Sequence, residues 1–120
     1  MAGRFCVSLS RAKDDTDRAT VAFVLANAAV ASEKETVVFL SAEGVRLGVA
    51  GYAVGIHESG FAPLVELMAT YASAGGKVYM CSPCFKKRGL DETKLVPGAT
   101  MIGGAVLVEF LGAGVPCVSY

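Results

Sequence analysis

Charged residues are scarce in this chain, and neither sign of charge dominates. Lysine, arginine, aspartate and glutamate together make up 18% of the 120 residues, and the formal net charge at pH 7 is zero. A protein that binds a nucleic-acid backbone ordinarily has a surplus of basic residues. The composition therefore gives no support for nucleic-acid binding.

The chain also lacks a long uninterrupted apolar run, although 53% of its residues are hydrophobic. The charge-free stretch Leu95–Val108 is broken by Pro97 and three glycines, whereas a membrane-spanning helix needs about 20 consecutive apolar residues. The apolar segment Phe5–Leu9 runs directly into polar residues, so we expect no signal peptide and a cytoplasmic location. A high apolar content without a membrane segment favours contacts between subunits, and we expect a homo-oligomer.

Histidine occurs once, as His57, and tryptophan is absent. A structural zinc site needs four ligands, usually from two pairs, so the sequence predicts no metal site; a zinc ion shared between subunits is the remaining metal alternative. No G-x-G-x-x-G motif follows the first predicted strand, which leaves dinucleotide binding without support. We therefore expect no cofactor. The four cysteines are not expected to form a disulfide scaffold in a reducing compartment.

Strand-like and helix-like apolar patterns alternate along the chain. We expect strands at Arg4–Leu9, Thr36–Leu40, Val78–Cys81, Ala99–Ile102 and Val115–Tyr120, and helices at Ala19–Ala31, Phe61–Ser73, Pro83–Arg88 and Gly103–Leu111. Continuous apolar strands that alternate with helices favour a parallel sheet covered by helices on both faces. The sequence thus predicts one domain over residues 1–120, of the α/β class, with three layers (α/β/α) and a five-stranded parallel sheet.

The first predicted helix, Ala19–Ala31, is apolar nearly all round. A surface helix normally has a polar face. We therefore expect the sheet on one side of this helix and another subunit on the other. Cys6 and Cys117 lie inside predicted strands and are expected to be core residues.

Four loops are expected at one edge of the sheet, because working loops of open α/β sheets follow the carboxyl ends of the strands. They are Ser10–Asp15, Ser41–Gly60, Cys81–Arg88 and Gly103-Gly104. On this rule, the loop of His57 and Cys81 share one side of the molecule.

Cys81 and Cys84 form the motif C-S-P-C at the end of a predicted strand, and Lys86, Lys87 and Arg88 follow. A helix start and nearby cations lower the pKa of a thiol, so we expect Cys81 to be a reactive thiolate. One reading is a single nucleophile that accepts or passes on sulfur, with Cys84 as a second thiol. The others are a metal pair, thioredoxin-like dithiol chemistry, and two small buried side chains.

Several neighbours of the cysteines have two readings. Lys86, Lys87 and Arg88 are either a solvated helix face or a positive field for a thiolate or persulfide. His57 either orients or protonates a group at Cys81, since its ordinary pKa is near neutral, or is a loop histidine bonded to backbone. Backbone N–H groups at Gly103 and Gly104 form a possible anion site at a helix start.

Carboxylates and an arginine outside this motif have simpler expected roles. Glu43 and Glu58 are expected to be solvated or capping residues. Arg46 is either a surface arginine or a further anion-binding group.

The chain resembles the DsrE/DsrF/TusD sulfur-relay family over its whole length. The resemblance rests on Cys81 followed by Gly89 and then Asp91-Glu92-Thr93, on Glu43-Gly44-Val45 after the second strand, and on His57 before Gly60-Phe61-Ala62-Pro63-Leu64. Ala74-Gly75-Gly76-Lys77 before the cysteine strand and a closing strand at the C-terminus complete it.

This resemblance implies a small α/β/α domain that assembles into dimers, trimers or hexamers, and it also implies the strand order. In sulfur-relay members the cysteine that matches Cys81 accepts sulfur as a persulfide and hands it to a partner. The resemblance thus implies a sulfur carrier or sulfurtransferase-like protein with donor and acceptor proteins or thiols. The alternatives are a thiol-disulfide redox protein, a thiol peroxidase included, that uses Cys81 and Cys84, and a non-catalytic homo-oligomeric interaction module.

Overall fold

Strands and helices alternate along the chain in the order that the sequence predicts. The computed structural model describes residues 3–112 and 114–120. The elements in these residues are β1 (Arg4–Leu9), α1 (Thr16–Ala31), β2 (Glu35–Leu40), the 3₁₀ helix η1 (Ala42–Gly48), α2 (Leu64–Ser73), β3 (Lys77–Cys81), α3 (Ser82–Lys87), β4 (Ala99–Ile102), α4 (Gly104–Leu111) and β5 (Cys117–Ser119).

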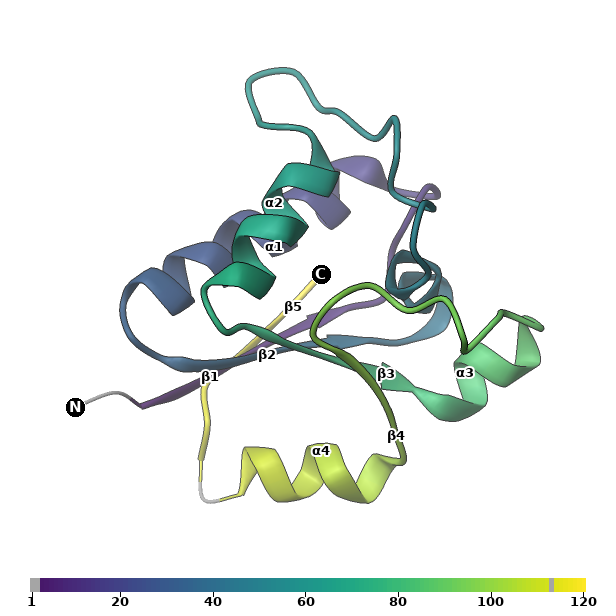
Figure 1. Cartoon of the computed structure of the whole chain (residues 1–120). Coiled ribbons are helices and arrows are strands. Elements are labelled where there is room, and N and C mark those ends of the chain that lie inside the picture. Colours follow the sequence, from purple (N-terminus) through teal and green to yellow (C-terminus); the bar gives the residue numbers. More distant parts are fainter. Residues whose placement is uncertain (1–2, 113) are drawn as a thin grey trace.

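The strands form one five-stranded parallel sheet in the order β4-β3-β2-β1-β5. Helices α1 and α2 lie on one face of the sheet and α4 lies on the other, while α3 projects from the end of β3 (Figure 1). The predicted three-layer α/β/α fold is therefore confirmed. Because all strands are parallel, the segments that follow β1, β2, β3 and β4 begin at the same edge of the sheet.

The main core lies between the sheet and the layer of α1 and α2. Asp15 caps α1, since its carboxylate accepts a hydrogen bond from the backbone N–H of Arg18, and a capped helix start is typical of aspartate. Phe23 on α1 packs edge-on against Tyr71 on α2, with 5.8 Å between the ring centroids. The second apolar side of α1 is thus partly covered by α2 of the same chain, where the sequence predicts another subunit.

Helix α2 begins three residues later than predicted, at Leu64. Pro63 is its N-cap residue and has extended backbone angles. The residue before a proline is disfavoured in helical conformation, so Phe61 and Ala62 remain in the preceding loop.

The two cysteines predicted to be core residues have different environments. Cys6 in β1 is completely buried, as expected, in a small cluster with Val37 and Phe110 on the α4 side of the sheet. Cys117 in β5 is exposed, so that prediction is wrong for Cys117. The reason is that β5 is an edge strand of the sheet formed by the described residues.

Among the residues that the structure describes, no helix has both the length and the apolar character needed to cross a membrane.

Candidate functional site

A pair of free thiols lies where β3 passes into α3. Cys81 is the last residue of β3 and the N-cap of α3, and Cys84 follows in the first turn of that helix. Pro83 occupies the first turn, where a missing backbone N–H is tolerated. Phe85 is fully buried and packs in the main core. This side chain anchors the short helix, and the anchor fixes the position of both half-buried thiols.

The two thiols share one hydrogen bond, which shifts their pKa values in opposite directions. The neighbouring Cys81 thiol, acting as a hydrogen-bond donor, lowers the pKa of Cys84; the backbone N–H of Ala42 and the charges of Arg88 and Lys87 lower it further, against an opposing effect of burial. Burial, followed by the interaction with Cys84, raises the pKa of Cys81. Because the two thiols share one hydrogen bond, the first proton lost belongs to the pair, and the charge of Arg88 favours its loss from either sulfur. The reactive thiolate of Cys81 stays a prediction.

Glu43 on η1 forms ion pairs with two arginines, one of which, Arg88, lies beside the thiols. Its carboxylate accepts hydrogen bonds from Nε of Arg46 and from Nε of Arg88, each at 2.8 Å. These two partners, Arg88 first, lower the pKa of Glu43. The Arg88 guanidinium also donates to the backbone carbonyl of Cys84 at 3.1 Å. Glu43 therefore holds Arg88 against the first turn of α3, beside the thiol pair.

Close packing between η1 and the end of β1 places Ala42 and Glu43 at the site. A Cβ atom on Gly44 would lie 2.3 Å from the carbonyl oxygen of Leu9, so only glycine fits there. Ala42 has a positive φ of 49°, a conformation that is uncommon for a residue with a side chain. This backbone geometry turns the chain at the end of β2 toward Cys84.

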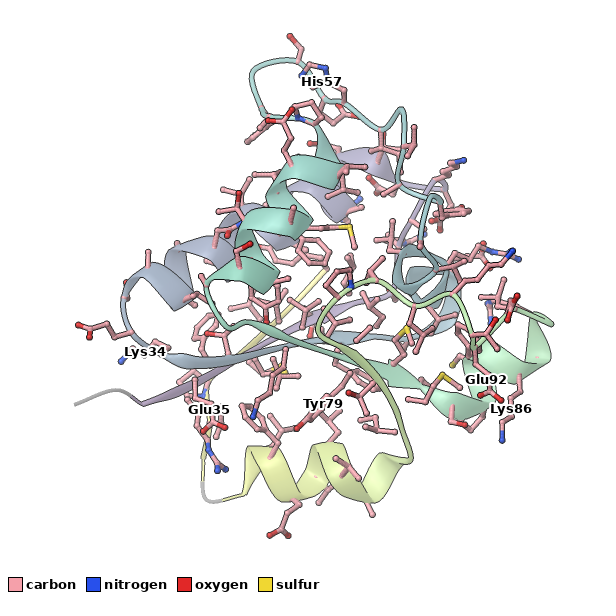
Figure 2. All side chains as sticks on the ribbon, in the orientation of Figure 1. Lys34, Glu35, His57, Tyr79, Lys86 and Glu92 are labelled. Carbon is pink, nitrogen blue, oxygen red and sulfur yellow. The ribbon has the colours of Figure 1, made fainter. Side chains whose placement is uncertain are left out.

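The remaining cations of α3 have different surroundings. Lys86 and Lys87 are exposed, and Figure 2 shows Lys86 at the outer surface of α3. The charge of Lys87 contributes to the lowered pKa of Cys84.

Strand pairing brings Gly103 and Gly104 close to Cys81. Cys81 is the register partner of Ile102 in β4, and Gly103 follows directly as the N-cap of α4. Both glycines are exposed, and a Cβ atom on either would meet no other atom within 4 Å. The N-terminus of α4 therefore opens beside the cysteine in uncrowded space.

His57 lies far from the thiols. Its Nε2 forms a 2.7 Å hydrogen bond with the carbonyl oxygen of Phe61 in the loop before α2. Figure 2 shows His57 at the top of the molecule, well separated from Lys86 on α3. The structure thus brings the first part of the segment Ser41–Gly60, which contains Ala42 and Glu43, to Cys84. It does not bring His57 there.

The sequence predicts no functional role for Ala42, and it predicts a solvated or capping role for Glu43. The position of Glu43-Gly44 directly after an apolar strand is the one signal that points to this edge of the sheet. For Ala42 the sequence has no signal, because it is the backbone N–H of Ala42, and not its side chain, that lowers the pKa of Cys84.

A family model described as the DsrE/DsrF-like family matches residues 3–118 of this chain. The chain belongs to the DsrE/DsrF-like family. Members of this family are associated with sulfur relay, and the match includes every residue of the site described above.

Two similar curated proteins come from archaea, and both are named only as uncharacterized. The protein of Methanocaldococcus jannaschii is 25% identical over 97 residues, which cover 81% of this chain and 35% of that protein. The protein of Methanopyrus kandleri is 30% identical over 95 residues, covering 79% of this chain and 75% of that protein. The DsrE/DsrF-like chain therefore spans only about a third of the first relative's length.

Two solved structures share the fold of this DsrE/DsrF-like chain. The YchN protein of E. coli superposes with a TM-score of 0.70 at 13% identity, over 98% of this chain and 99% of that one. A protein of unknown function from Methanobacterium thermoautotrophicum superposes with a TM-score of 0.66 at 12% identity, over the full length of both chains. At these identities the likeness concerns the fold alone.

Proposed function

We propose that this DsrE/DsrF-like chain is a sulfur carrier, which holds a sulfur atom as a persulfide on Cys81 and passes it to a partner protein or thiol. The observation that carries the proposal is the pair of free thiols at the carboxyl end of β3, in which Cys84 has a lowered pKa. Sulfur transfer needs a thiolate, and the lowered pKa of Cys84 favours one in this pair. The association of the family with sulfur relay supports the same chemistry.

In the proposed loading step, Cys84 acts as the proton acceptor and Cys81 as the nucleophile. The Cys84 thiolate takes the proton of the Cys81 thiol, and the Cys81 sulfur attacks the outer sulfur of a donor persulfide. The sulfur–sulfur bond of the donor breaks, its inner sulfur leaves as a thiolate and takes up a proton, and Cys81 becomes the persulfide. A thiol with the higher pKa is the stronger nucleophile once ionised, which favours Cys81 over Cys84 for the attack.

Positive groups surround the position where the persulfide anion forms. Arg88 lowers the pKa of both thiols, and Lys87 lowers that of Cys84. The N-terminus of α4 at Gly103 and Gly104 lies beside Cys81, and helix N-termini favour negative charge. In this proposal these groups stabilise the bound persulfide, and the exposed Lys86 adds only to the positive electrostatic potential around α3.

A second function, thiol–disulfide chemistry, is favoured by the interaction between the two thiols. The Cys84 thiolate would attack the inner sulfur of the Cys81 persulfide and release hydrosulfide. The products are a Cys81–Cys84 disulfide and a reduced sulfur atom, so the protein would release sulfur reductively. A reductant must then restore both thiols.

Intact-mass spectrometry of the native protein after incubation with inorganic polysulfide distinguishes these functions. Every chain in this test carries Cys117→Ser, which removes the exposed thiol outside the site. We expect this parent chain and its Cys84→Ser variant to gain one sulfur atom, with a lower rate in the Cys84→Ser variant, and its Cys81→Ser variant to gain none. Full loading of Cys81→Ser would overturn the assignment of Cys81. Loss of two hydrogen atoms, in the parent chain only, would instead establish the dithiol function of Cys81 and Cys84.

We further propose that the carrier is a homo-oligomer that also docks donor and acceptor proteins. Large apolar side chains are exposed on both layers: Val54 is 67% exposed in the loop before α2, and Val108 is 70% exposed on α4. Val65 (43% exposed) lines the same hollow as Val54, and Val106 (44% exposed) lies with Val108 on α4. Exposed apolar residues that gather in this way are typical of protein–protein contacts. Light scattering should give a multiple of the chain mass that falls in Val54→Asp or Val108→Asp. A monomeric wild-type chain would refute the proposal.

A further inference from the structure

Two cysteines outside the proposed sulfur-carrier site face each other across neighbouring strands. Cys6 of β1 and Cys117 of β5 are register partners in a parallel pair. Side chains directly opposite each other on neighbouring strands point to the same face of the sheet. Cys6 is also the register partner of Val37 in β2, and its side chain lies on the face of the sheet that α4 covers. Strand β2 separates this pair from the strand of Cys81.

The two thiols differ sharply in their access to solvent. Cys6 is completely buried, and Phe110 of α4 belongs to the cluster around it. Cys117 is exposed, because β5 is an edge strand. A reagent in solution therefore reaches Cys117 first.

Backbone hydrogen bonds on both sides of Cys117 hold the pair in register. The N–H of Cys6 donates to the carbonyl of Pro116 at 2.9 Å, and the N–H of Tyr120 donates to the carbonyl of Ser8 at 2.8 Å. Neighbouring strands lie about 4.8 Å apart, and the Cα atoms of disulfide-bonded cysteines lie roughly 4.4–6.8 Å apart. The strand spacing thus falls within the Cα range of a disulfide, and the two thiols lie close enough to interact by a side-chain hydrogen bond.

We propose that Cys117 and Cys6 form a second dithiol site, at which Cys117 exchanges with small-molecule disulfides and Cys6 then closes a Cys6–Cys117 disulfide. The disulfide joins the edge strand β5 covalently to the centre of the sheet. The site is independent of the sulfur-carrier site.

The chemistry proceeds in two balanced steps. The Cys117 thiolate attacks one sulfur of the small disulfide, whose sulfur–sulfur bond breaks, and one small thiol leaves. Cys6 then loses its proton and attacks the Cys117 sulfur, and the second small thiol leaves. In sum, two protein thiols are oxidised to one disulfide and one small disulfide is reduced to two thiols.

The second step is expected to be the slow one. Burial, followed by the interaction with Cys117, raises the pKa of Cys6 to about 12. A mixed disulfide on Cys117 removes the negative charge of that thiolate, but the burial of Cys6 remains. Since only the thiolate attacks a disulfide, closure should accelerate as the pH rises.

The test uses the full chain with Cys81→Ser and Cys84→Ser, so that Cys6 and Cys117 are its two thiols. The native protein is incubated with glutathione disulfide at two alkaline pH values and followed by intact-mass spectrometry. We expect a transient gain of one glutathionyl group, followed by a species two hydrogen atoms lighter than the reduced protein. Proteolysis should yield a peptide pair joined between Cys6 and Cys117.

The matched control adds Cys117→Ser, a change at an exposed position that does not disturb the core. This variant should acquire no adduct and no disulfide. A stable glutathionyl adduct that never closes, a disulfide-linked dimer through Cys117, or no reaction at Cys117 would each overturn the proposal. Failure of sulfur loading at Cys81 has no bearing on this outcome, since Cys81 is absent from the tested chain.

Discussion

Replacing Glu43 by glutamine tests whether the carboxylate between Arg46 and Arg88 stabilises the site. Both guanidinium groups donate from Nε to Glu43 at 2.8 Å. The side chain of Arg88 is 16% exposed and that of Glu43 is 37% exposed, so solvent screens the pairs in part. Partly exposed ion pairs contribute up to about 1 kcal/mol each, and glutamine keeps one acceptor oxygen. We expect Glu43→Gln to lower the free energy of unfolding by about 1 kcal/mol at neutral pH.

The pH dependence of this difference gives the sharper test. The arginines lower the pKa of Glu43 in the folded state. Such a carboxylate stabilises the fold fully above its unfolded pKa, and this stabilisation disappears as the pH falls through the folded pKa. The two unfolding free energies should therefore converge between pH 7 and about pH 3.

Urea denaturation followed by circular dichroism measures this difference at each pH. Glu92→Gln, at an exposed carboxylate, is the matched control and should stay close to wild type at neutral pH. Equal stability of wild type and Glu43→Gln at pH 7, or a gap that persists unchanged in acid, would refute the reasoning.

Three further substitutions test the site and its support. Arg88→Gln removes a charge that lowers the pKa of both thiols, so alkylation of Cys84 by iodoacetamide at neutral pH should slow; an unchanged rate contradicts this role. Tyr71→Phe removes a buried hydroxyl whose one hydrogen is shared between the backbone carbonyls of Thr36 in β2 and Lys77 in β3. This change should cost about 1–3 kcal/mol of unfolding free energy without changing the alkylation rate of Cys84; a loss near zero counts against this role of Tyr71. Gly44→Ala places a Cβ atom 2.3 Å from the Leu9 carbonyl oxygen. It should lower the melting temperature, by the equivalent of about 1–3 kcal/mol, and it should slow alkylation of Cys84. A wild-type melting temperature and a wild-type alkylation rate would show that η1 can shift without cost.

The predicted fold is confirmed because its signals are local in the sequence. Apolar strand segments such as Thr36–Leu40, and helix patterns such as that of α2, recur at regular distances. Alternation of this kind leaves a parallel sheet with helices on both faces as the natural arrangement. The boundaries that differ have equally local causes, as Pro63 shows at the start of α2.

The roles of site residues that the sequence left open depend on distances between residues that no local pattern contains. The rule that loops share one edge of the sheet holds for Ala42 and Glu43, but His57 lies further along the same connection and bonds to the Phe61 carbonyl instead. The pKa shifts of Cys81 and Cys84 depend first on the hydrogen bond between the two thiols and on their burial, and then on the backbone N–H of Ala42 near Cys84. A spacing in the sequence cannot give these contacts.

By itself, the sequence determined the α/β class, the parallel sheet and the position of Cys81 at the end of a strand, because periodicity, glycine turns and apolar runs act over short distances. Only the tertiary structure decided which strands are neighbours. That order places Gly103 beside Cys81, makes β5 an exposed edge, and sets Cys117 against Cys6. Pairing between distant strands depends on packing over the whole sheet. For that reason the sequence shows the Cys81–Cys84 pair, which lies within one turn, but not the Cys6–Cys117 pair, which forms across two strands.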